Sequence, residues 1–122
     1  MATDLRHERG KLGEAHAARH LEHLGYAVLA QRHRTRFGEI DLVAVDGDAL
    51  VFVEVKTRRS GSGSPWDALG TTKQRQVRAM AAAWLAETPD RPHTRELRFD
   101  AIGVTIDRSG ALVSLDHLQG AF

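Results

Sequence analysis

The chain has 122 residues, no cysteine, a formal net charge of +1 and 42% hydrophobic residues. This composition is typical of one compact domain spanning residues 1–122, and it excludes global disorder, disulfide bonds and thiolate metal sites. No apolar run approaches the ~20 residues of a membrane-spanning helix and no signal peptide is recognisable, so we expect a cytoplasmic protein with no membrane partner.

The first half of the chain predicts one helix and three strands. A helix is expected over residues 10–24, because apolar residues recur there at helical spacing: Leu12, Ala15, Ala18, Leu21 and Leu24. Gly25 is a stop signal for this helix. Strands are predicted over residues 26–34, 38–46 and 49–57, with a turn at residues 46–48, and they can pair as an antiparallel meander.

The second half predicts a loop, a helix and two strands. Residues 58–65 are rich in Gly and Ser, which indicates a flexible loop that could close over a bound ligand. A helix follows over about residues 72–87, with one apolar face formed by Val77, Met80, Ala81 and Trp84. Strands over residues 96–106 and 111–118 complete the order αβββαββ. A helix between the third and fourth strands implies a right-handed parallel crossover, so we expect an α/β (α+β) fold with a mixed sheet and helices packed on it.

Charged residues interrupt two of the apolar strands. Asp41 lies in the second strand, and Glu54 and Lys56 lie in the third. Because strand residues alternate between faces, Glu54 and Lys56 share one face, and Glu39 and Asp41 share one face of the preceding strand.

The turn between these strands decides which carboxylates meet. A two-residue turn at residues 47–48 pairs residue 46 with residue 49 and places Asp41 opposite Glu54. A turn at residues 46–47 places Glu39 opposite Glu54 and keeps Asp41 two residues along on the same face. A three-residue loop would break the match unless a bulge restored it.

Two facing carboxylates repel one another unless a cation lies between them. Oxygen ligands at such a separation suit Mg²⁺, with Mn²⁺ as an alternative, and Lys56 could then stabilise charge on a phosphate. Glu14 shares the sheet-facing side of the first helix with Ala18 and Leu21, so it is a candidate fourth group of the site. The pattern indicates metal-assisted hydrolysis of a phosphodiester.

Other interpretations of these residues remain open. Asp41, Glu54 and Lys56 could form a salt-bridge cluster on a solvated sheet face, although Phe52 shares that face and argues against full solvation. Glu14 could equally be an ordinary acid on the helix surface.

The remaining polar candidates have weaker signals. Glu39 is expected to contact the site residues without binding the metal itself, or to face solvent. Asp100 is expected to support the site or to form structural hydrogen bonds. His16, His20 and His23 lie roughly opposite the Glu14 face of the helix, so a solvated face is favoured over a zinc site.

Asp41 followed by Glu54-Val55-Lys56 resembles the Asp…(Asp/Glu)-x-Lys signature of the restriction-endonuclease-like superfamily, although Ile40 stands where the superfamily's name expects proline. Glu14 in a preceding helix is similar to the arrangement in archaeal Holliday-junction resolvases. Almost the whole chain resembles the YraN-like family of small bacterial proteins, which are described as candidate endonucleases. The matching segments are Gly13-Glu14 with Ala17, residues 38–43, residues 51–58, Lys73 with the helix after it, residues 98–100, residues 117–118 and residues 121–122.

The resemblance implies a restriction-endonuclease-like fold and a Mg²⁺-dependent endonuclease. By matched position, Asp41 and Glu54 would ligate the metal, helped by the carbonyl of Val55. Lys56 would be the catalytic lysine, and Glu14 would be an outer or second-metal ligand.

The basic residues suggest nucleic acid as the partner. More than half of the Lys and Arg residues lie in three stretches: Arg32, Arg34 and Arg36; Lys56, Arg58 and Arg59; Lys73, Arg75 and Arg78. Within and beside these stretches, the residues predicted to contact nucleic acid are Arg34, Arg36, Arg58, Lys73 and Gln76. Structured or branched DNA is the expected substrate, and analogy suggests a homodimer. The rival interpretations are a nucleic-acid-binding module without catalysis and an interaction protein that kept a nuclease fold.

Overall fold

The computed structural model describes residues 5–61 and 70–122, and its elements follow the predicted order. These elements are α1 (Leu5–His23), β1 (Ala27–Thr35), β2 (Gly38–Asp46), β3 (Ala49–Arg59), α2 (Thr71–Glu87), β4 (Glu96–Ile106) and β5 (Leu112–Leu118). β3 extends to Arg59, into the segment predicted as a loop, and residues 62–65 of that loop lie outside the described residues. Neither described helix is long and apolar enough to cross a membrane.

The strands form one mixed sheet in the order β1-β2-β3-β4-β5. β3 and β4 run parallel, whereas the other neighbouring strands run antiparallel. The predicted meander and the predicted parallel pairing of the strands that flank α2 are therefore confirmed. The fold is α+β, with two helices against a five-stranded sheet.

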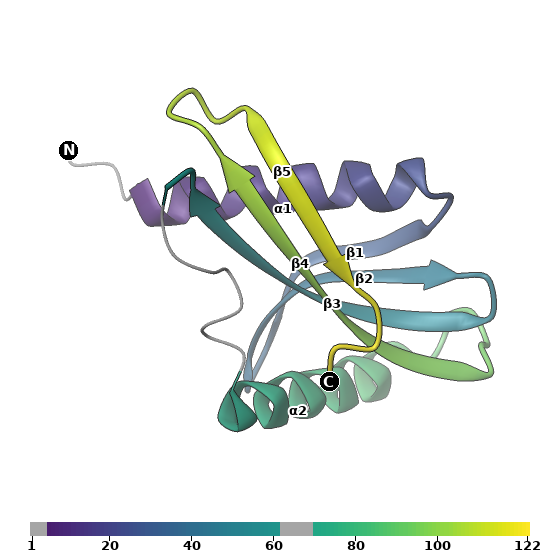
Figure 1. Cartoon of the computed structure of the whole chain (residues 1–122). Helices are drawn as coiled ribbons and strands as arrows, with labels where there is room; N and C mark the ends of the chain where they lie inside the picture. Colours follow the sequence, from purple (N-terminus) through teal and green to yellow (C-terminus); the bar gives the residue numbers. More distant parts are fainter. Residues whose placement is uncertain (1–4, 62–69) are drawn as a thin grey trace.

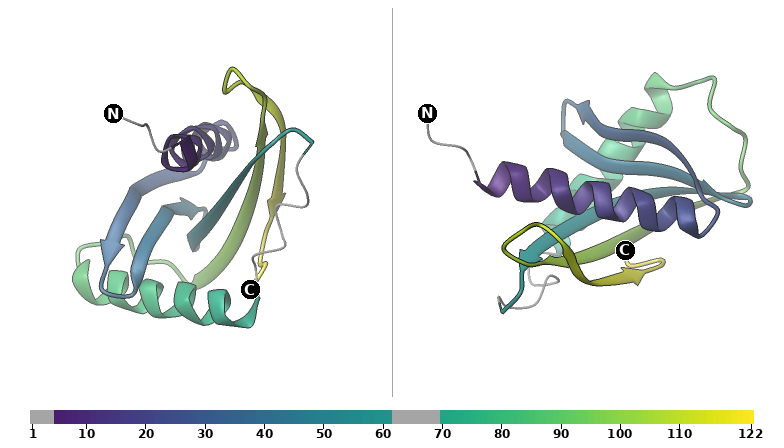
Figure 2. Two further views of the ribbon diagram at one scale, coloured as in Figure 1. Left: turned by 90° about the vertical axis from the view of Figure 1, so that its left-hand side faces the viewer. Right: turned by 90° about the horizontal axis from the view of Figure 1, so that it is seen from above.

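The two helices cover opposite faces of the sheet (Figures 1 and 2). β3 contributes to both faces, because Val51 and Val53 pack in the cluster under α1 while Leu50 and Phe52 pack in the cluster under α2. A strand covered on both sides reads as a continuous apolar run, as β3 does. The predicted apolar face of α2 is confirmed, since the buried residues of this helix are Val77, Met80, Ala81 and Trp84.

The predicted apolar face of α1 is wrong in part. Leu12, Ala15 and Leu24 are exposed, while Ala17, Ala18 and Leu21 form the buried face. Residues spaced by three fall short of a full turn of 3.6 residues, so a row with that spacing drifts around the helix. The ends of the predicted row consequently leave the sheet.

The predicted solvated face of histidines is also wrong for two of its members. His16 Nε2 lies 3.0 Å from the carbonyl oxygen of Gly110, and His20 Nε2 lies 3.1 Å from His117 Nδ1. The β4–β5 hairpin lies along this flank of α1 (Figure 2, right). The sequence of α1 alone does not show that this hairpin packs against the helix in addition to the sheet.

At one end the sheet divides into two arms. The residue pairs between β2 and β3 run from Asp46–Ala49 to Leu42–Val53. Beyond them, residues 38–40 of β2 pair with β1, and residues 54–59 of β3 pair with β4. We call this divergence, formed by residues 38–41 of β2 and 54–59 of β3, the sheet fork; the arms spread apart in Figure 1.

Candidate active site

Asp41 lies in the sheet fork, next to the last β2–β3 pair. The pairing of Asp46 with Ala49 is the register that a two-residue turn at residues 47–48 predicts. Where the ladder stops, the Asp41 side chain replaces a backbone acceptor, because its Oδ2 accepts a hydrogen bond of 2.7 Å from the Val55 amide. This bond fixes the carboxylate beside the Glu54-Val55-Lys56 segment.

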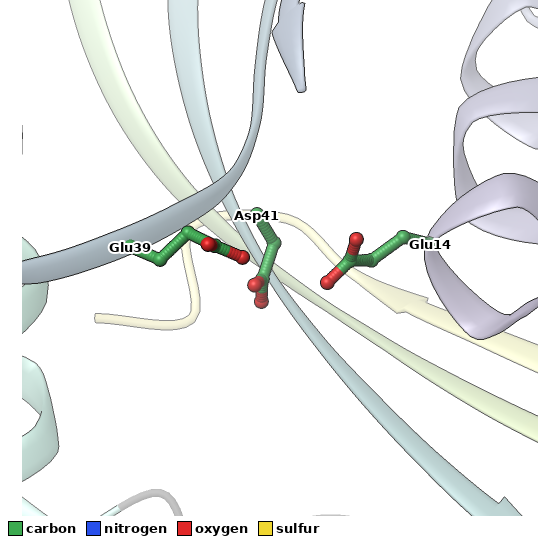
Figure 3. Close-up of side chains that lie close together, drawn as sticks. All are labelled: Glu14, Glu39 and Asp41. Atoms are coloured by element: carbon green, nitrogen blue, oxygen red, sulfur yellow. The ribbon is translucent and has the colours of Figure 1, made fainter. Parts of the chain in front are cut away.

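Three carboxylates meet at this point. Oxygens of Glu14, Glu39 and Asp41 all lie within 4.8 Å of one another. Figure 3 shows Glu14 reaching from α1 toward Asp41, with Glu39 approaching from the other side. The Glu14 side chain is only 12% exposed, and its buried Oε2 has no hydrogen-bond partner. We call these three residues the acidic cluster.

Arg32 of β1 is the nearby cation. Its Nε lies 3.4 Å from Glu14 Oε2 and 3.4 Å from Glu39 Oε1. Arg32 thus pairs with two of the three carboxyl groups, and Lys73, whose charge acts on Asp41, is itself paired with Glu54. The acidic cluster is therefore short of positive charge if all three of its members ionise.

Glu54 is held separately from the acidic cluster, by two lysines. Its Oε1 lies 3.3 Å from Lys56 Nζ and 3.0 Å from Lys73 Nζ, and its side chain is 5% exposed. Lys56 follows on the same strand face, whereas Lys73 comes from α2. Glu54 still acts on Asp41 through charge, as the pKa of Asp41 shows.

Burial and neighbouring negative charge disfavour ionised carboxylates here. Burial, followed by the charge of Glu54, raises the pKa of Asp41 to about 8, against the hydrogen bond from Val55. Burial also raises the pKa of Glu14, although Arg32 opposes this shift. An added cation would relieve both effects.

The acidic cluster fits a hard divalent cation. Mg²⁺ prefers oxygen ligands and usually binds one or two carboxylates together with water. The acidic cluster offers only oxygen donors, and one of them, Glu14 Oε2, accepts no hydrogen bond and is in contact with Arg32 through an ion pair. Among the predicted ligands, Asp41 and Glu14 come together, while Glu54 lies beside them in contact with lysines. Glu39 was not predicted as a ligand, although strand alternation placed it on the face of Asp41.

Two of the residues predicted to contact nucleic acid meet at the tip of the β1–β2 hairpin. The guanidinium carbon of Arg36 lies 4.7 Å from the centroid of the Phe37 ring. Gln76 of α2 donates a 2.9 Å hydrogen bond to the carbonyl oxygen of Phe37. Both Arg36 and Gln76 are exposed.

The other three predicted contact residues are dispersed. Arg34 is exposed on β1. Arg58 is half-buried and donates from Nε to Thr105 Oγ1 at 3.1 Å. Lys73 points inward to Glu54 and belongs to the site itself.

The pKa of Asp41 predicts a pH-dependent stability of the metal-free protein. An unfolded Asp41 releases its proton near the ordinary value of 3.8, whereas the folded protein holds it up to pH of about 8. The contribution of this group is complete below pH 3.8 and declines as the pH rises toward 8. We therefore expect Asp41→Asn, measured by urea unfolding in chelator, to stabilise the protein near pH 8 by on the order of 1–3 kcal/mol, and much less near pH 5.

The control for this measurement is Asp116→Asn, which changes an exposed acid on β5. It is expected to leave the pH profile of stability unchanged. A constant stability difference between Asp41→Asn and the wild type at every pH would contradict the raised pKa.

Comparison with known proteins finds a consistent set of relatives. A family model described as "Uncharacterised protein family UPF0102" matches residues 13–104, which include Glu14, Asp41, Glu54 and Lys56. A UPF0102 protein of Rhodococcus opacus (strain B4) is 42% identical over 114 residues, covering 93% of this chain and 94% of the relative. A UPF0102 protein of Parafrankia sp. (strain EAN1pec) is 46% identical over 114 residues, with the same coverage. A UPF0102 protein of Streptomyces griseus subsp. griseus is 46% identical over 112 residues, covering 91% and 92%.

Proposed function

The chain belongs to the UPF0102 family, and from this premise and the geometry of its site we propose that it is a Mg²⁺-dependent endonuclease that hydrolyses phosphodiester bonds of nucleic acid. The observation that carries the proposal is the acidic cluster, in which the buried Oε2 of Glu14 has no hydrogen-bond partner. The Glu54-Val55-Lys56 segment lies directly beside it. We further propose that the fold is restriction-endonuclease-like and similar to that of archaeal Holliday-junction resolvases.

The side chains have different roles in the proposed reaction. Asp41 and Glu14 would provide the oxygens that hold the cation, and the Val55 amide fixes the orientation of Asp41. When bound, Mg²⁺ supplies Lewis acidity that withdraws charge from a phosphate oxygen and makes water a better nucleophile. Lys56 provides positive charge next to Glu54, where it can stabilise the charge that develops on the phosphate.

The substrate is bound through its backbone. The exposed Arg34 and Arg36 attract phosphates without regard to sequence, and Gln76 lies beside the same hairpin tip. Among the described residues we recognise no element that would read base edges, which favours recognition of DNA shape, such as a branch. Binding as a homodimer remains a prediction from analogy.

The test is cleavage of labelled single-stranded, duplex, flap and four-way-junction DNA with Mg²⁺ or Mn²⁺. The wild type is expected to cleave at least one substrate, and Asp41→Ala is expected to abolish cleavage because the acidic cluster loses its central ligand. Asp116→Ala removes one exposed acid on β5 and is expected to cleave like the wild type.

Failure takes two recognisable forms. Cleavage that persists in Asp41→Ala would show that the chemistry lies elsewhere. Binding of DNA without cleavage, together with the absence of Mg²⁺ or Mn²⁺ binding in calorimetry, would favour the nucleic-acid-binding module.

A further inference from the structure

Arg32 has an unusual backbone for its position. Its φ is +51°, in the left-handed region that non-glycine residues rarely adopt, although it lies within β1. Gln31 pairs with Leu42 and His33 pairs with Ile40, so Arg32 lies across from Asp41. The strained residue thus faces the acidic cluster, which is where such strain often has a function.

β2, the strand that faces Arg32, also departs from the regular alternation of a strand at this point. Ile40 packs in the cluster under α2, whereas Leu42 packs in the cluster under α1, although residues two apart on a strand normally share a face. The local break lets Asp41 point into the sheet fork and brings the Arg32 side chain over the acidic cluster.

The contacts of Arg32 are electrostatic and incomplete. Its Nε lies 3.4 Å from one oxygen of each of two carboxylates, and the Glu14 oxygen still has no hydrogen-bond partner. The Arg32 side chain is 30% exposed, so it can leave toward solvent without disrupting the core. By contrast, a fork-to-fork pair between Arg and a carboxylate would use two parallel hydrogen bonds.

We propose that Arg32 is a displaceable counter-cation of the acidic cluster, which leaves Glu14 and Glu39 when a divalent cation enters and then binds the phosphate of the substrate. This inference rests on the proposed function and names a further residue of that site. Mg²⁺ contacts its oxygen ligands directly at about 2.0–2.1 Å and carries twice the charge, so it neutralises the acidic cluster better than a guanidinium at 3.4 Å. Two cations in one small acidic cluster repel, which makes the two occupants alternatives.

The released side chain suits the second role. Guanidinium is planar and offers a fork of donors that matches a phosphate. After release it remains tethered opposite Asp41, next to the position where a scissile phosphate would meet the cation. Metal binding would in this way release a phosphate-binding group only when the divalent cation is in place.

The first experiment measures Mg²⁺ and Mn²⁺ affinity by calorimetry, without nucleic acid. Arg32→Asn removes the charge while asparagine tolerates the left-handed backbone. Arg34→Asn is the matched control, because it removes the same charge from an exposed residue of the same strand. We expect Arg32→Asn to bind the metal about fivefold or more tightly than the wild type, and Arg34→Asn to be nearly unchanged.

The second experiment measures DNA binding by fluorescence anisotropy, with and without Mg²⁺. A Lys56→Ala background prevents cleavage during the measurement. Mg²⁺ should increase DNA affinity in this background, and the increase should be clearly smaller when Arg32→Asn is added. Arg32→Gly, which also suits a positive φ, replaces Arg32→Asn if that variant fails to fold.

Each outcome has a defined meaning. Metal binding by Arg32→Asn that equals or falls below that of the wild type overturns the counter-cation and leaves the proposed nuclease intact. An equal Mg²⁺-induced increase in DNA affinity with and without Arg32 overturns its role toward phosphate. If neither the wild type nor the variant binds metal, both the inference and the proposed function fail.

Discussion

Lys56→Ala is expected to lower the rate of phosphodiester cleavage by about 10²–10⁴-fold while leaving the fold intact. Lys56 belongs to neither hydrophobic core cluster, so its side chain adds little to the core. Its removal does not isolate the buried Glu54, because Lys73 Nζ remains 3.0 Å from the same Oε1. The loss should therefore reflect chemistry, measured as single-turnover cleavage of the best DNA substrate, together with an unchanged thermal melting curve.

Lys73→Ala is the matched control for this prediction. It also removes one positive charge from Glu54, and it leaves Lys56 in place at 3.3 Å. We expect a smaller loss of cleavage than for Lys56→Ala. Equal losses in the two variants would mean that the lysines merely neutralise Glu54, and full activity in Lys56→Ala would remove the catalytic lysine from the proposal.

Asp100→Ala is expected to destabilise the protein by about 3–5 kcal/mol near neutral pH, because it leaves buried partners without their counter-charge. The Asp100 side chain is fully buried. It accepts hydrogen bonds from Arg98 Nε at 2.9 Å, from His117 Nε2 at 2.8 Å and from the Gly120 amide at 3.0 Å. These contacts join β4, β5 and the C-terminal segment, so urea unfolding should show the loss in the whole transition.

The pH dependence of this effect has the opposite sign to that of Asp41. Burial on its own raises the pKa of Asp100, but the hydrogen bonds from His117, Arg98 and Gly120 lower it below its usual value. The stabilisation is therefore present above the unfolded pKa of 3.8 and is lost as the pH falls through the folded value. The difference between Asp100→Ala and the wild type should shrink in strong acid.

Asp46→Ala provides a control within the same hydrogen-bond network. Asp46 Oδ2 lies 2.9 Å from Arg98 NH1, but its side chain is 37% exposed. Because Asp46 is much more exposed than Asp100, we expect its ion pair with Arg98 to contribute only about 1 kcal/mol. If Asp46→Ala and Asp100→Ala lower the free energy of unfolding equally, burial of Asp100 is not the source of its effect.

Local pattern explains what the sequence predicted correctly about the fold. The element order, the bounds of β2 and β4 and the buried face of α2 follow from spacing within single segments. The β2–β3 register also follows from a local feature, the turn at residues 47–48, but the ladder ends at Leu42–Val53, so the predicted pairing of Asp41 with Glu54 is not formed. By contrast, the buried face of α1 depended on the sheet and on the β4–β5 hairpin beside it, and the helix sequence did not encode either position.

The candidate site shows the same contrast between local pattern and long-range contacts. The sequence by itself determined which residues are candidates for the site, because Asp41, Glu54 and Lys56 are charges in strands that otherwise read as core. Only the tertiary structure decided how they are grouped, with Glu14, Glu39 and Asp41 in one cluster and Glu54 between Lys56 and Lys73. The physical reason is that the sheet fork ends the β2–β3 ladder at Leu42–Val53, and two helices on opposite faces then bring Glu14 and Lys73 to that opening. Such contacts join segments far apart in the chain, and the hydrophobic periodicity within one segment carries no information about them.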